Sequence, residues 1–142
     1  MIGRLVLIGL AIAATPALGD ESATLTLKIE NLSAKGGDLR CGVYDQASFV
    51  VRGSKPVLGK IVAAKPGAMS VVFEGLKPGE YGVKCYQDEN RNGHLDMGMM
   101  GMMPQEPYGM SNDAKAQMSG PPWDEAHFAL KPGAATITIH LH

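Results

Sequence analysis

The sequence has 142 residues, with 13 basic and 14 acidic side chains and a formal net charge of -1. This length is typical of a single domain and excludes most multi-domain enzymes. Because phosphate binding needs a surplus of lysine and arginine on one face, the balanced charge gives no reason to expect a nucleic-acid partner.

The first 19 residues have the pattern of an export signal. Arg4 precedes an apolar run over residues 5–14, and small residues stand at the two positions that define a cleavage site before Asp20. The run is too short to span a bilayer, although an uncleaved anchor is the alternative interpretation. We therefore expect a signal peptide over residues 1–19, and a single exported domain over residues 20–142 with no membrane span after cleavage. The periplasm or the extracellular space is its expected location.

Apolar residues alternate with polar residues along several short segments, which is the period of a half-buried strand. Turns rich in glycine and proline separate these segments. In chain order, the pattern predicts strands at residues 23–32, 39–43, 57–63, 68–74, 81–87, 126–130 and 135–141. Seven short strands of this kind predict an all-β fold, a seven-stranded antiparallel sandwich.

The two cysteines, Cys41 and Cys85, lie on the apolar faces of their predicted strands. In a small exported domain an even pair indicates a disulfide, which would close a long loop and stabilise the fold by about 4 kcal/mol. The sequence has no Cys-x-x-Cys redox motif, and neither cysteine has a histidine at metal-ligand spacing. We therefore expect a structural disulfide that joins two strands through the core.

A segment of 37 residues, from Asp88 to Asp124, has little periodicity of either kind. A connection of this length in a compact domain is usually functional or disordered, and this one is neither charged nor simple enough to be an obvious linker. Any binding site is therefore expected in this long loop.

The long loop begins with a pattern that resembles a calcium-binding turn. Candidate oxygen ligands fall at positions 1, 3, 5, 7 and 9 of the pattern, and they are Asp88, Asn90, Asn92, the main-chain carbonyl of His94, and Asp96. Gly93 supplies the turn at position 6, but Met99 stands at position 12 in place of a bidentate glutamate. The pattern predicts a weak Ca²⁺ site. The alternative is a bare Asx turn that binds no ion.

A cluster of methionines follows directly, at Met97, Met99, Met100, Met102 and Met103. Thioether sulfur is a soft ligand that favours Cu(I), so three thioethers, or two with His94, are the alternative metal site. His140 and His142, at the C-terminal end, are candidates to assist. The commonest role of methionine is apolar filling, which here would pack the loop onto the sandwich.

Three blocks of sequence carry a family resemblance, and they are FEGLKPGEY at residues 73–81, DENRNGHLD at 88–96 and PQEPYGMSN at 104–112. Together they resemble domain-of-unknown-function family number 2141, a family of exported bacterial proteins, over residues 25–141. The resemblance implies a prealbumin-like or immunoglobulin-like sandwich and supplies no catalytic residues. Family members tend to carry phenylalanine or isoleucine where this chain has methionine, which favours packing as the general role of those positions.

Catalytic motifs are absent from the sequence. It has no Gly-x-Ser-x-Gly, and Ser111 and Ser119 have no histidine nearby. Trp123, which follows two prolines, is expected to cap the core and not to bind a ligand. We therefore expect a non-catalytic binding or accessory module whose partner is a protein, a glycan or a metal ion. The alternatives are a periplasmic copper-binding protein and, third, a small hydrolase without a recognisable motif.

Overall fold

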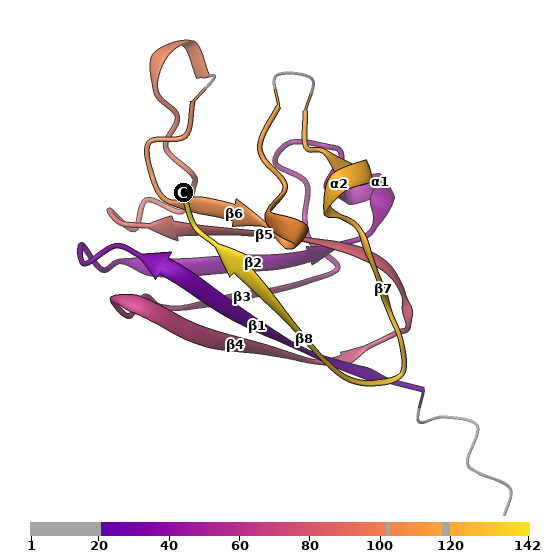
Figure 1. Ribbon diagram of the computed structural model, residues 1–142. Helices are drawn as coiled ribbons and strands as arrows, with labels where there is room; N and C mark the ends of the chain where they lie inside the picture. Colours follow the sequence, from indigo (N-terminus) through magenta and orange to yellow (C-terminus); the bar gives the residue numbers. More distant parts are fainter. Residues whose placement is uncertain (1–20, 102, 118–119) are drawn as a thin grey trace, which may run out of the picture.

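A computed structural model describes residues 21–101, 103–117 and 120–142, so the expected signal peptide, Met102 and Met118 lie outside the described residues. Short strands form two packed sheets (Figure 1). The strands are β1 (Ala23–Leu32), β2 (Asp38–Tyr44), β3 (Leu58–Ala63), β4 (Gly67–Leu76), β5 (Gly79–Asp88), β6 (Tyr108–Met110), β7 (Phe128–Leu130) and β8 (Gly133–His140). The structure thus confirms the all-β sandwich.

One sheet has the order β4-β1-β8, and the other has the order β3-β2-β5-β6, with β7 paired to β5. The structure corrects the predicted seven antiparallel strands in two respects: the described residues form eight strands, and β1 and β8 run parallel. The additional strand, β6, has three residues and is too short to show a periodicity. Its second edge is filled by the chain end, where His142 N–H donates to Tyr108 O at 2.9 Å.

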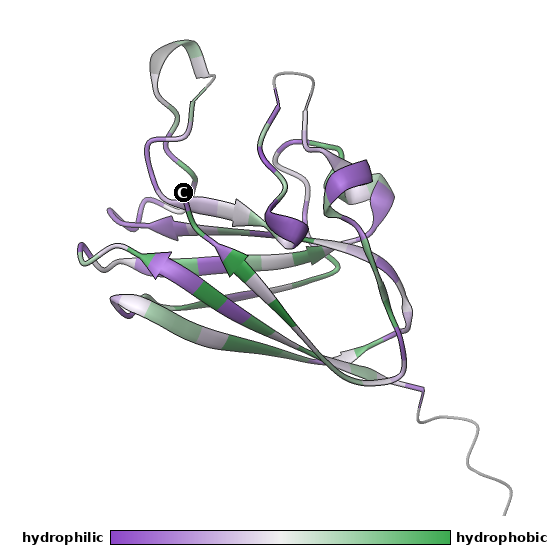
Figure 2. Cartoon of the chain, viewed as in Figure 1, coloured by the Kyte–Doolittle hydropathy of each residue, from purple (hydrophilic) through white to green (hydrophobic). Residues whose placement is uncertain are grey.

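The core lies between the two sheets and consists of the apolar rows that the alternation predicted (Figure 2). Leu25, Leu27 and Ile29 of β1 are fully buried. Cys41 and Cys85 stand directly opposite each other on β2 and β5, and they form the predicted disulfide. Because this bond joins residues 44 positions apart, it removes much of the conformational freedom of the unfolded chain.

A second, smaller apolar cluster lies outside the five-stranded sheet. It is built by the short helices α1 (Gln46–Phe49) and α2 (Trp123–Ala126), which lie side by side in Figure 1, and by Met110 and Ala114. A side chain at Gly82 would lie 2.7 Å from the Phe49 ring, so glycine allows α1 to pack directly on β5. Trp123 is 9% exposed and its ring centroid lies 5.5 Å from that of Phe49. Trp123 is therefore buried as expected, but it packs in this second cluster and does not cap the core between the sheets.

Two short 3-10 turns, η1 (Met99–Gly101) and η2 (Ser111–Asp113), complete the elements of the described chain. Within the residues that the structure describes, no helix has the length and apolar character needed to cross a membrane.

Candidate functional site

The Asx-rich turn begins at a buried carboxylate. Asp88, the last residue of β5, is fully buried and accepts backbone N–H groups from Asn92 at 3.1 Å and Gly93 at 2.8 Å. The φ of Gly93 is 89°, a left-handed conformation that glycine adopts without a steric penalty. The Arg40 guanidinium lies 3.2 Å from the same carboxylate. A buried charge needs partners of this kind, so Asp88 fixes the path of the turn.

Three further side chains converge on the outer side of the turn. Asn90 and Asn92 each direct an amide N–H to the Asp96 carboxylate, at 2.5 and 2.6 Å. The carbonyl oxygens of the same two amides accept the backbone N–H groups of Asn92 and His94. Hydrogen bonds from Asn92 and then Asn90 hold the pKa of Asp96 below its ordinary value. The structure therefore brings together Asn90, Asn92 and Asp96, while Asp88 is held on the inner side of the turn and the His94 side chain is exposed.

A carboxylate from outside the pattern closes this turn. Glu106 is 6% exposed, and its two oxygens accept N–H groups from Glu89 at 2.6 Å and from Asp96 at 2.8 Å. It therefore clamps the two ends of the turn from a point 18 residues after Asp88. In the sequence, the position of Glu106 between Pro104 and Pro107 is the one feature that could have suggested this role.

The base of the turn is anchored to the loop between β1 and β2. The fully buried Gln87 amide donates to Ser33 O at 3.1 Å and Gly36 O at 2.8 Å, and it accepts Ser33 N–H at 2.8 Å. A side chain at Gly37 would lie 2.2 Å from the Asp88 carbonyl oxygen, so only glycine permits this approach. The turn consequently rests on a rigid frame, which favours a preformed site.

The chemistry of the turn is that of hard oxygen ligands. Within the described residues, no three histidine, cysteine, aspartate or glutamate side chains form a group that could hold a metal ion. An ion at this turn therefore depends on the amide oxygens of Asn90 and Asn92 in addition to Asp96. Each of these carbonyl oxygens has a second lone pair, and oxygen ligands of this type suit Ca²⁺.

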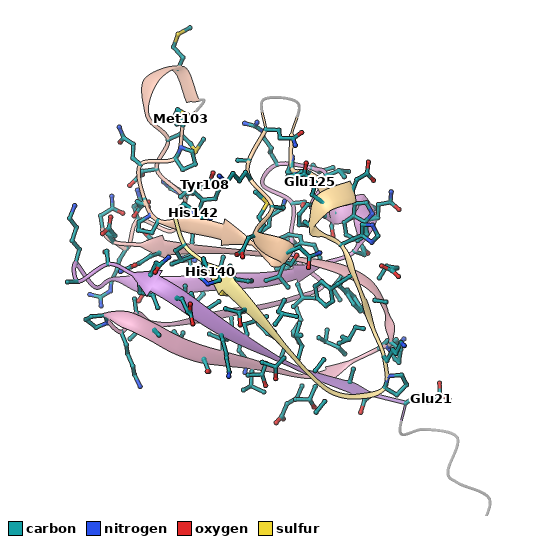
Figure 3. The ribbon with its side chains drawn as sticks, viewed as in Figure 1. Glu21, Met103, Tyr108, Glu125, His140 and His142 are labelled. Atoms are coloured by element: carbon teal, nitrogen blue, oxygen red, sulfur yellow. A yellow bond between two sulfur atoms is a disulfide. The ribbon has the colours of Figure 1, made fainter. Side chains whose placement is uncertain are left out.

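A methionine-bearing projection, residues 97–104, rises directly after the turn and is here called the methionine finger (Figure 1). Met97 bridges to Pro104, and Gly98 N–H donates to Met103 O at 2.6 Å, so the finger is a small hairpin. Met97 is 39%, Met103 68% and Met100 92% exposed. Figure 3 shows Met103 on this projection, away from the two sheets.

These three methionines do not pack the loop onto the sandwich, which was the simpler expectation. Met100 also has a φ of 59°, a backbone conformation that is unfavourable for a residue with a bulky side chain. Met110, in contrast, is 6% exposed and packs in the second apolar cluster. The finger therefore exposes apolar side chains on a turn that contains a left-handed residue.

The hydroxyl of Ser111 has a structural role. It is fully buried, donates to Ala126 O at 2.6 Å and accepts Val83 N–H at 2.9 Å. His140 lies instead between the carboxylates of Asp113 and Glu30, each 2.9 Å from a ring nitrogen. His140 and Ser111 therefore do not form a nucleophile–base pair.

The fold and the turn together define a class: a small disulfide-bonded β-sandwich that carries an Asx-rich turn and an exposed finger on one connection. The family model "Uncharacterized protein conserved in bacteria (DUF2141)" matches residues 27–138. The chain belongs to this family. No curated protein and no solved structure matches the chain.

Proposed function

We propose that the chain is an exported, non-catalytic binding module whose Asp88–Asp96 turn is ordered by a weakly bound Ca²⁺ ion. The observation that carries the proposal is the convergence of Asn90, Asn92 and Asp96 on one point above a buried frame. Two amide N–H groups now meet the Asp96 carboxylate. A divalent cation would take over that role with a larger charge, while both amide oxygens turn toward it.

The affinity expected for this ion is low. Position 12 of the calcium pattern has no glutamate, and the Arg40 guanidinium already neutralises part of the charge of Asp88. One free carboxylate and two amides would give a dissociation constant of about 1 mM, at the weak end of extracellular calcium modules. The proposed location supports this, because only exported proteins meet free Ca²⁺ at such concentrations.

Export rests on the apolar N-terminal pattern, and the Cys41–Cys85 disulfide supports it because such bonds persist in oxidising compartments. The partner class is a protein or a glycan, and the turn and the finger form the end of the molecule that would contact it. No catalytic role is proposed.

Calorimetric and thermal titration with Ca²⁺ tests the calcium proposal. With a dissociation constant near 1 mM, about 10 mM Ca²⁺ should stabilise the protein by about 1.4 kcal/mol. The Asp96→Asn variant should lose this response, whereas Asp124→Asn, an exposed acid outside the turn, should keep it. An equal response of both variants, or no response of the unmodified protein, would remove the site.

A second candidate function is copper binding by the methionine finger. The hairpin places Met97 and Met103 on facing arms with exposed side chains, and two thioethers in this arrangement are suitable for Cu(I). Titration with Cu(I) under reducing conditions should give binding that is lost when Met97, Met100 and Met103 are all replaced by leucine. Met110→Leu, at the buried methionine, is the matched control.

A further inference from the structure

One continuous region of the chain is basic although the whole chain is not. Between Asp45 and Glu74 there is no acidic residue, and four basic residues occur: Arg52, Lys55, Lys60 and Lys65. This region contains α1, β3 and most of β4. The segment that carries β3 therefore has a local positive charge that the total of -1 conceals.

Strand β3 lies in this region and forms an end of the five-stranded sheet, since β2 is its only partner (Figure 1). Ala64 N–H donates to Gly37 O at 3.0 Å, which fixes the phase of the β2–β3 ladder. Because backbone groups alternate in direction along an antiparallel pair, the N–H and C=O groups of Gly59, Ile61 and Ala63 are directed away from β2. No hydrogen bond among the described residues uses them.

The outer side chains of the same strand are apolar and exposed. Ile61 is 59% exposed and Val57, directly before β3, is 51% exposed, while Gly59 and Ala63 are also exposed. The alternate residues of β3, Leu58 and Val62, pack on the core. An exposed apolar edge strand with unused backbone groups is a template for an added strand.

The neighbouring unpaired edge, that of β4 in the other sheet, is covered by a side chain and so is protected from pairing with an added strand. Lys60 extends across and donates its ammonium to Val72 O, and the charge also lies 5.7 Å from the centre of the Phe73 ring. No side chain of the described residues covers β3 in this way. Pro56 and Pro66 flank β3, which limits the free edge to the length of one short strand.

We propose that the free edge of β3 binds an extended peptide segment of a partner protein, with apolar residues at its centre and acidic residues at its ends. The added strand would pair with the backbone groups of Gly59, Ile61 and Ala63. Its acidic ends would meet Lys55 and Lys65, which form no ion pair among the described residues. This proposal does not depend on the calcium site.

Two other occupants fit the surface less well. A second copy of the chain, added antiparallel at the same edge, would place Lys55 near Lys65 of the other copy and so bring like charges together. A lipid surface would leave the backbone groups of the edge without hydrogen-bond partners. Of the three occupants, the extended peptide with acidic ends fits both the charge of this edge and its unpaired backbone groups.

The test uses two labelled peptides that share a central Val-Thr-Val-Thr-Val sequence and differ in their ends, glutamate in one and lysine in the other. Fluorescence anisotropy should give at least about tenfold tighter binding of the glutamate peptide. Hydrogen exchange should show slower exchange of the Ile61 and Ala63 amides in its presence. Equal binding of both peptides, or protection of other amides only, would overturn the proposal.

Two variants of Ile61 test whether its backbone N–H group is needed for peptide binding. Ile61→Pro removes an N–H group that points away from β2 and should abolish binding, whereas Ile61→Thr keeps the N–H and should bind within about threefold. A double variant, Lys55→Glu with Lys65→Glu, should reverse the preference between the two peptides, and it does not require proline to be tolerated in β3. Unchanged preference in the double variant would refute the proposal. Self-association that Ile61→Pro removes would instead assign the edge to a second copy.

Discussion

Two neighbouring segments of the long connection use apolar residues in opposite ways. The segment from Ser111 to His127 is tied to the sandwich, since the Ser111 hydroxyl accepts the Val83 N–H of β5 at 2.9 Å and Trp123 packs on Phe49. The methionine finger is held only at its base, and no side chain of its described residues forms a hydrogen bond within the structure. The tied segment is therefore buried against the sandwich, whereas Met97, Met100 and Met103 of the finger are exposed.

The largest expected difference in stability is between variants that truncate Trp123 and Met100. Trp123→Ala removes a ring that is 91% buried and should lower the free energy of unfolding by about 3–5 kcal/mol. Met100→Ala should change it by less than about 0.5 kcal/mol, because that side chain is 92% exposed. Urea denaturation of both variants measures the two values. Similar losses of unfolding free energy in both variants would show that the finger also packs on the sandwich and that the two segments do not differ in this respect.

A smaller effect is expected at the base of the finger. Glu106→Gln replaces one of the two carboxylate oxygens that accept the N–H groups of Glu89 and Asp96. Leaving a buried N–H without an acceptor should destabilise the protein by about 1–3 kcal/mol. Amide exchange at Asp96 should become faster through local opening, while exchange at Val83, which Ser111 holds, should rise only with the global loss of stability. Equal acceleration at both amides would mean that the two segments are not independent.

The same division explains what the sequence could and could not predict. Strands β1, β2 and β5 follow from alternation over five or more residues, and the Cys41–Cys85 disulfide follows from two such apolar rows. These are local patterns, because a residue's position along a strand decides the face on which its side chain lies.

The features that the sequence did not predict depend on contacts between residues that are distant in the sequence. Arg40 reaches Asp88 across 48 positions, and β6 exists because β5 and the chain end both offer it backbone partners. The turn pattern identified Asp88 and Asp96, but Glu106 completes the turn from a separate block. No periodicity in the sequence links these residues, so only the folded arrangement reveals them.

The smallest effect concerns the link between the tied segment and β8. His140 donates its N–H to Asp113 at 3.1 Å, and its ring lies between Asp113 and Glu30. The hydrogen bond that the ring donates to Asp113, followed by the charge of that carboxylate, raises the pKa of His140 above its ordinary value of 6.5. The protonated ring therefore favours the folded state, and this contribution is fully present below pH 6.5.

As the pH rises from 6.5 through the higher folded-state pKa, the contribution should be lost. We expect the thermal midpoint to fall slightly over this interval in the unmodified protein and to stay level in His140→Gln. His142→Gln, at the exposed chain end, is the control and should retain the pH dependence. A fall that persists in His140→Gln would assign the titration to another group. The tied segment would then depend on its buried contacts at Ser111 and Trp123, and not on the ion pair at its edge.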